Sequence, residues 1–154
     1  MADPLGAALA ETECKDLVEH ALNGAKALLE SEGSFRPHVL ALAPGGEIEV
    51  VFAESDEGDA QDDLEALRSY LGDEAEAGSL RAAAIVLNTW IHSEDRATKR
   101  DAVVAIVEHS AGVARHTHQF YALEERRGDL ATSFAVTWQE RATEPVESSL
   151  FAAP

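Results

Sequence analysis

The residues with the clearest chemical potential are two histidines placed two positions apart, in the run His116-Thr117-His118. Side chains at alternate positions of a β-strand point to the same face, so both imidazoles can reach one metal ion. Zinc sites use such nitrogen ligands, and the ligand type also suits Ni²⁺. A zinc or nickel site is therefore one hypothesis for this chain.

A third ligand becomes available if the chain turns back through a two-residue loop at 111–112. In that register His109 pairs with Ala114 and lies diagonally opposite His116 on the same face. The predicted metal ligands are accordingly His116, His118 and His109. The alternative is that these histidines occupy the polar end of a sheet face or contact a partner subunit.

The same pair resembles the His-x-His element of the zinc deubiquitinase-like (JAMM/MPN) family, and Asp129 has the spacing of that family's aspartate. Gln119 stands where the family has proline, and Arg126 stands where it has serine. The resemblance covers about fourteen positions, from His116 to Asp129, and misses two of the family's key residues, so we do not assign the chain to that family. It does not extend to the family's activity.

Another set of residues resembles a catalytic group in sequence but not in its expected geometry. In Glu108-His109-Ser110, neighbouring strand residues point to opposite faces, so Glu108 cannot orient His109. Glu108 is instead expected to face Arg115 across the hairpin as a surface ion pair of little energetic value. Cys14 falls on the apolar stripe of a helix, which indicates a small core residue rather than a nucleophile. These patterns favour a non-enzymatic protein and leave a metal-dependent enzyme as the alternative.

The charge of the chain excludes two classes of partner. Its 154 residues include 29 acidic and 12 basic side chains, for a net charge of -17. Nucleic acids and anionic membranes are bound through clustered Lys and Arg, and no such cluster occurs. No apolar run suits a membrane span and no secretory leader is recognisable, so a cytoplasmic location is expected.

Two explanations of the acidic composition remain open. Scarce Lys with abundant Ala, Asp and Glu is typical of a GC-rich bacterial or salt-adapted proteome. High salt screens the self-repulsion of such a surface. The other reading is that the charge attracts a basic protein partner.

Hydrophobic periodicity predicts two helices and six strands. The first helix covers about residues 10–31, and an acidic loop at 54–63 leads into a second helix that ends near Gly72. The predicted strands are 35–43, 47–53, 81–91, 102–109, 113–123 and 130–138. In the strand at 47–53, apolar and acidic side chains alternate, so the face that carries the acidic side chains is expected to contact solvent.

Short turns between consecutive strands imply antiparallel pairing. The predicted fold is an α+β two-layer sandwich, in which two amphipathic helices cover one face of a mostly antiparallel sheet. Residues 1–140 are expected to form a single domain. Residues 141–154 form a tail, whose Leu150 and Phe151 can pack against that domain. The expected function is non-enzymatic and works through protein contacts, as a homodimer or with a basic partner. The alternative is a metal-binding protein or metal-dependent enzyme that uses the histidine pair.

Overall fold

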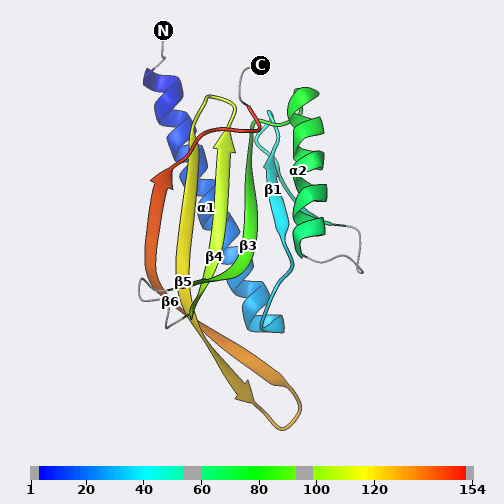
Figure 1. The fold of residues 1–154 in the computed structure, drawn as a ribbon, viewed down its shortest axis with the longest axis vertical. Coiled ribbons are helices and arrows are strands. Elements are labelled where there is room, and N and C mark those ends of the chain that lie inside the picture. Colours follow the sequence, from blue (N-terminus) through cyan, green and yellow to red (C-terminus); the bar gives the residue numbers. More distant parts are fainter. Residues whose placement is uncertain (1–3, 54–59, 93–98, 152–154) are drawn as a thin grey trace.

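A computed structural model describes residues 4–53, 60–92 and 99–151 of the chain. It contains two helices and six strands (Figure 1). In chain order these are α1 (Pro4–Glu32), β1 (His38–Leu42), β2 (Ile48–Phe52), α2 (Ala60–Glu76), β3 (Ala82–His92), β4 (Lys99–His109), β5 (Ala114–Arg127) and β6 (Thr132–Pro145). The predicted α+β class and the element order are confirmed.

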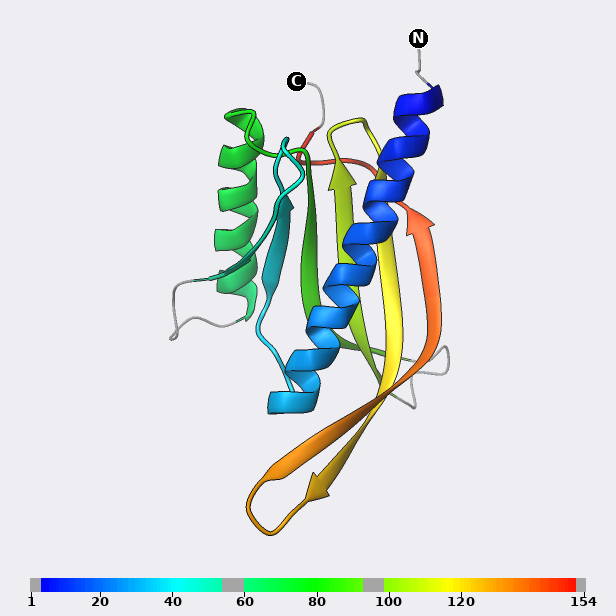
Figure 2. The ribbon, with the colours of Figure 1, turned by 180° about the vertical axis from the view of Figure 1, so that it is seen from behind.

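The six strands form one antiparallel sheet in the order β2-β1-β3-β4-β5-β6. The two edges are therefore β2 and β6. Strands β5 and β6 continue beyond the rest of the sheet as a long hairpin (Figure 1). Helix α1 crosses the sheet diagonally, so that it passes over several strands (Figure 2).

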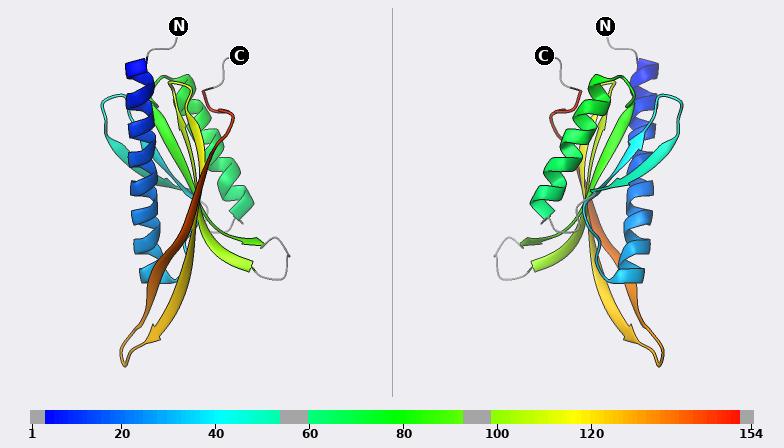
Figure 3. Two further views of the ribbon diagram at one scale, coloured as in Figure 1. Left: turned by 90° about the vertical axis from the view of Figure 1, so that its left-hand side faces the viewer. Right: turned by 90° about the vertical axis from the view of Figure 1, so that its right-hand side faces the viewer.

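The two helices lie on opposite faces of the sheet, which corrects the predicted placement of both on one face (Figure 3). One core cluster joins α1 to Leu40, Ala84 and Ala105, whereas a second joins α2 to Val39 and Ala83. The reason is visible in β1, all five of whose residues are buried. A strand that is apolar on both faces must be covered on both.

Helix α1 buries the stripe predicted for it, including Leu17, Leu22 and Leu29. It ends at Glu32, and the next residue, Gly33, has a φ of 80° and donates its N–H to the Leu29 carbonyl at 2.8 Å. A left-handed glycine is the usual way to close a helix. The ring of Phe134 packs so closely on Gly33 that a Cβ there would lie 2.8 Å from it.

Several elements are longer than predicted. Helix α2 continues past Gly72 to Glu76, and β6 runs through Pro145, so the first residues of the predicted tail belong to the sheet. Leu150 and Phe151 pack against the core cluster on the α2 side, as expected for docking side chains. Residues 54–59 of the predicted acidic loop lie outside the described residues.

Candidate functional site

His116 and His118 lie on one face of β5, as predicted, with ring centroids 4.3 Å apart. Glu144 on β6 places Oε1 4.0 Å from His116 Nδ1. Burial lowers the pKa of His116, and His118 lowers it further, while Glu144 opposes the shift. Within the described residues, no group of three or more His, Cys, Asp or Glu side chains is arranged to hold a metal ion.

His109 lies on the opposite face of the sheet, which corrects the predicted three-histidine cluster. Its N–H donates to the Val113 carbonyl at 2.7 Å, and the Gly112 N–H donates to the His109 carbonyl at 2.9 Å. The turn therefore holds three residues rather than two, and Gly112 supplies the positive φ, 91°, that such turns require. A register change of one residue moves a strand side chain to the other face.

His109 instead joins a network that ties α1 to the sheet. Its Nδ1 accepts the Ala111 N–H at 3.0 Å, so the ring proton lies on Nε2 and is donated to Glu13 at 3.0 Å. Arg81 binds the same carboxylate, with an N···O distance of 2.8 Å. Burial raises the pKa of Glu13, but the bonds and charges of His109 and Arg81 outweigh it, and the pKa is lowered.

Glu108 is 3% exposed and anchors the segment that follows β6. Its carboxylate accepts hydrogen bonds from the Ser148 hydroxyl at 2.7 Å, from the Ser149 N–H and hydroxyl, and from the Leu150 N–H at 3.0 Å. The predicted pair with Arg115 is not formed, because Arg115 lies opposite Val107 and not opposite Glu108. Sequence reasoning missed this role because the serines lie about forty residues further along the chain, beyond any local pattern.

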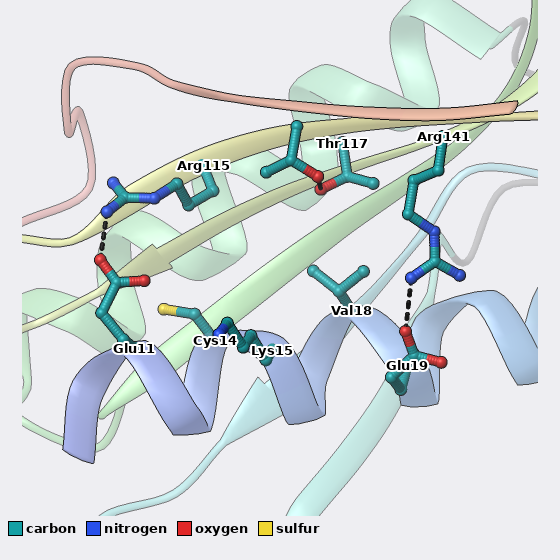
Figure 4. A pocket seen from close by; sticks show the side chains of 9 residues that line it. Glu11, Cys14, Lys15, Val18, Glu19, Arg115, Thr117 and Arg141 are labelled. Atoms are coloured by element: carbon teal, nitrogen blue, oxygen red, sulfur yellow. Dashed lines mark hydrogen bonds and ion pairs between the residues drawn. The ribbon is translucent and has the colours of Figure 1, made fainter. Parts of the chain in front are cut away.

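A groove of about 460 Å³ separates α1 from β5 and β6 (Figure 4). Two arginines of the sheet reach across it to two glutamates of α1. Arg115 binds Glu11, and Arg141 binds Glu19 at 2.6 Å. Since each guanidinium is neutralised by a carboxylate, neither is free to hold an anion.

Cys14 lines the same groove (Figure 4). Thr117 and Thr143 line it as well, and their hydroxyls lie 3.0 Å apart. Burial raises the pKa of the Cys14 thiol to about 11, and Glu11 adds to the shift. A thiol that stays protonated at neutral pH is a poor nucleophile. The Cys14 thiol is therefore a packing group in this groove and not a nucleophile.

The outer edge of β2 differs from all of these places because its apolar side chains are not covered. Ile48, Val50 and Phe52 are 38%, 52% and 45% exposed. We call these three residues the apolar row. They share the face that α1 covers elsewhere, since they lie opposite Leu42, Leu40 and His38 of β1. The face of β2 that carries Glu49 is exposed, as predicted. The opposite face, which carries the apolar row, is exposed as well.

The apolar row is a contiguous patch. The other large apolar side chains that are exposed within the described residues lie on separate elements, and these are Leu9, Trp90, Leu130 and Val146. Isolated exposed apolar residues are normal on protein surfaces, whereas a row of them on a sheet edge is unusual. Figure 3 shows the β1–β2 hairpin turned toward the α1 side of the sheet.

Residues of β2 also line three hollows. On the α1 side, Ile48 borders a hollow of about 170 Å³ and Phe52 borders one of about 360 Å³. On the α2 side, Val51 and Tyr70 border a hollow of about 430 Å³. The edge therefore offers recesses on both faces, and no other described strand pairs with its outer side. We take it as the candidate functional site.

No family model, no curated protein and no solved structure matches this chain. No helix in the described part of the chain combines the length and apolar character needed to cross a membrane.

Proposed function

We propose that this protein is a non-enzymatic protein of the cytoplasm that acts by binding another protein chain at the β2 edge. The observation that carries the proposal is the apolar row, Ile48, Val50 and Phe52. It stays about half exposed on a strand that pairs, within the described part of the chain, with β1 alone. Burying such a row removes apolar surface from water at about 25 cal/mol per Å². We expect a second protein chain to bury the apolar row.

The opposite edge of the sheet supports this choice by contrast. Strand β6 ends in Gln-Glu-Arg-Ala-Thr-Glu-Pro, so charged side chains and Pro145 occupy the edge. Charges and proline are the common devices that keep sheet edges from pairing with other chains. The β2 segment, Ile-Glu-Val-Val-Phe, has no proline and only one charged residue. The molecule thus protects one edge and leaves the other able to pair.

Three side chains of types often used in catalysis have structural roles in the fold. His109 is bound to Glu13, and Glu108 holds the segment after β6. Cys14 is buried and keeps its proton. These assignments support a binding role over an enzymatic one.

A second candidate is metal binding by His116 and His118. The specific observation in its favour is that the two rings lie 4.3 Å apart on one strand face, with Glu144 beside them. A stable zinc site commonly has three or four protein ligands. This candidate therefore ranks below the β2 edge.

Photo-crosslinking tests the proposed function directly. A benzophenone amino acid replaces Phe52 in one variant and Leu130, which is fully exposed on the β5–β6 hairpin, in a control variant. On irradiation in lysate of the source cells, we expect a discrete protein adduct at position 52 and none at position 130. Equal adduct patterns at the two positions, or no adduct at position 52, would contradict the proposal.

A further inference from the structure

We infer that the β2 edge binds an extended, basic segment of a different protein, whose apolar residues occupy alternate positions and which adds to the sheet as a seventh strand. This inference rests on the proposed function and names the partner class for it. It follows from three properties of β2: the direction of its free backbone groups, the shape of the surface beside it and the sign of the charge around it.

The backbone of β2 is ready to accept a strand. The Ala43 N–H donates to the Glu47 carbonyl at 2.8 Å, which fixes Glu47 as a residue whose polar groups face β1. Because these directions alternate along an antiparallel strand, the N–H and C=O groups of Ile48, Val50 and Phe52 face outward. A segment laid beside β2 can therefore form a regular ladder with these three residues, as in known strand-addition complexes.

The apolar row and its recesses suit alternate apolar side chains. Ile48 shares its hollow with Leu17 and Leu42. Phe52 shares its hollow with Leu28 and Phe35, beyond the far end of the strand. An added strand places every second side chain on this face, and small or branched apolar residues there would cover the row.

The remaining side chains of the added strand would meet acidic groups. Glu49 is exposed on the other face of β2, and Asp62 lines the hollow beside Val51. Burial raises the pKa of Tyr70 in that hollow, and Glu49 and Glu74 raise it further, as expected in a negative field. On the α1 side, Asp16 and Glu32 line the two hollows, together with Glu13, whose charge is already paired with Arg81.

The basic groups near the β2 edge do not cancel the negative charge around it. His20 lines one hollow, and Arg36 lines the other but is bound to Asp63 at 2.9 Å. Arg81 donates to the Pro44 carbonyl in the β1–β2 turn, and Glu13 balances its charge at 2.8 Å. A second copy of this chain would bring a net charge of -17 against another of -17. Complementary potentials favour association and like potentials oppose it. The surroundings of β2 therefore favour a basic segment over a second copy.

The probe for this inference is a fluorescent peptide of alternating lysine and valine, seven residues long. Two controls carry the same residues in separate blocks, or glutamate in place of each lysine. We expect the alternating peptide to bind at least about tenfold more tightly than either control, because only it can pair its backbone and place both charge and apolar groups correctly. Its affinity should fall as salt rises from about 0.05 M to about 0.5 M, where screening becomes strong.

Three variants locate the binding. Val50→Pro removes an outward N–H without touching the β1–β2 ladder, and should weaken binding by at least about fivefold, since one ladder bond and its neighbours are lost. Glu49→Lys should weaken it by about threefold, whereas Glu124→Lys, which changes the net charge equally on the distant hairpin, should leave it within about 1.5-fold. Circular dichroism of each variant establishes that it is folded.

The outcomes separate this inference from the proposed function. Equal affinity for the alternating and block peptides, or equal effects of the two lysine variants, would overturn the basic-segment inference. If wild type sediments as a dimer that Val50→Pro dissociates, and no peptide binds, the occupant is a second copy. In that case the inference fails but the proposed contact at β2 stands. Failure of the position-52 crosslink, by contrast, removes the proposed function itself.

Discussion

A single residue of register decides the chemistry available to His109. The three-residue turn at 110–112 places it on the α1 face, where Glu13 accepts its Nε2 proton. A two-residue turn would have placed it beside His116. The sequence contains Gly112 in either case, so composition alone does not distinguish the two turn lengths. The His116–His118 spacing, in contrast, was predictable, because alternation along a strand does not depend on the turn.

This geometry makes a definite prediction about metal binding. If the chain takes up zinc, His118→Ala should abolish the uptake and His109→Ala should leave it unchanged, because only His118 shares a face with His116. The measurement is equilibrium dialysis of untagged protein followed by metal analysis. Uptake near zero in wild type would remove the metal hypothesis, and loss of uptake in His109→Ala would contradict the observed register.

His38 gives the molecule a pH dependence close to the β2 edge. Its ring lies between Phe35 and Phe52, with centroid distances of 5.3 and 4.9 Å. Burial lowers the pKa of His38, and the bond from its Nδ1 to the Arg36 carbonyl opposes the shift. Because the folded-state pKa lies below the unfolded value of about 6.5, the folded protein binds fewer protons. The stability is therefore full above that value and falls as the pH drops below it.

The corresponding experiment compares unfolding midpoints in urea at pH values from about 7.5 down to about 5, across the histidine range. Wild type should lose more stability over this interval than His38→Leu, which cannot take up the proton. His116, whose pKa is also lowered, contributes to both proteins and cancels in the comparison. Parallel curves for the two proteins would show that His38 is not buried as described.

Strands β1 and β3 explain why the two helices lie on opposite faces of the sheet. The run Ala82–Val86 of β3 is buried at every position, and β1 is equally buried. Continuous apolar runs are typical of strands covered on both faces, so the sequence contained the signal for helices on both sides. Two-sided cover was nevertheless not predicted, because consecutive strands with short turns are more often covered on one side only.

The segment after β6 depends on Glu108 for its position. Replacing Glu108 with Ala should lower the free energy of unfolding by about 1–3 kcal/mol, because the Ser149 and Leu150 N–H groups lose their acceptor. Truncation after Pro145 should also destabilise, since it leaves a buried carboxylate without donors. Combined, the two changes should cost less than their sum. Strict additivity in chemical unfolding would show that Glu108 does not hold this segment.

For the molecule as a whole, the acidic surface predicts a response to salt. With 29 acidic and 12 basic side chains, repulsion among the acidic groups should oppose folding in dilute buffer. The thermal midpoint should keep rising between about 0.15 M and about 1 M salt, over which the screening length falls from about 8 to about 3 Å. A flat or falling midpoint would contradict salt adaptation of the surface and leave attraction of a basic partner as its explanation.

The fold class and the element order could be predicted because they depend on local periodicity, which the sequence displays. The site could be predicted only in part. Alternation along β2 separates Ile48 and Val50 from Glu49, but it does not reveal that β2 is an edge strand. That property depends on which strands pair, and β1 pairs with β3 across a helix that intervenes in the chain. Exposure of the apolar row is therefore a consequence of topology.

The central claim, that β2 pairs with an incoming strand, is tested most directly by residue-resolved amide exchange in NMR. In the free protein, the amides of Ile48, Val50 and Phe52 should exchange fast, whereas those of Glu49 and Val51 should be protected by β1. With the alternating lysine–valine peptide bound, the three fast amides should slow markedly and the other two should change little. Binding that leaves the Ile48, Val50 and Phe52 amides fast would contradict strand addition at this edge.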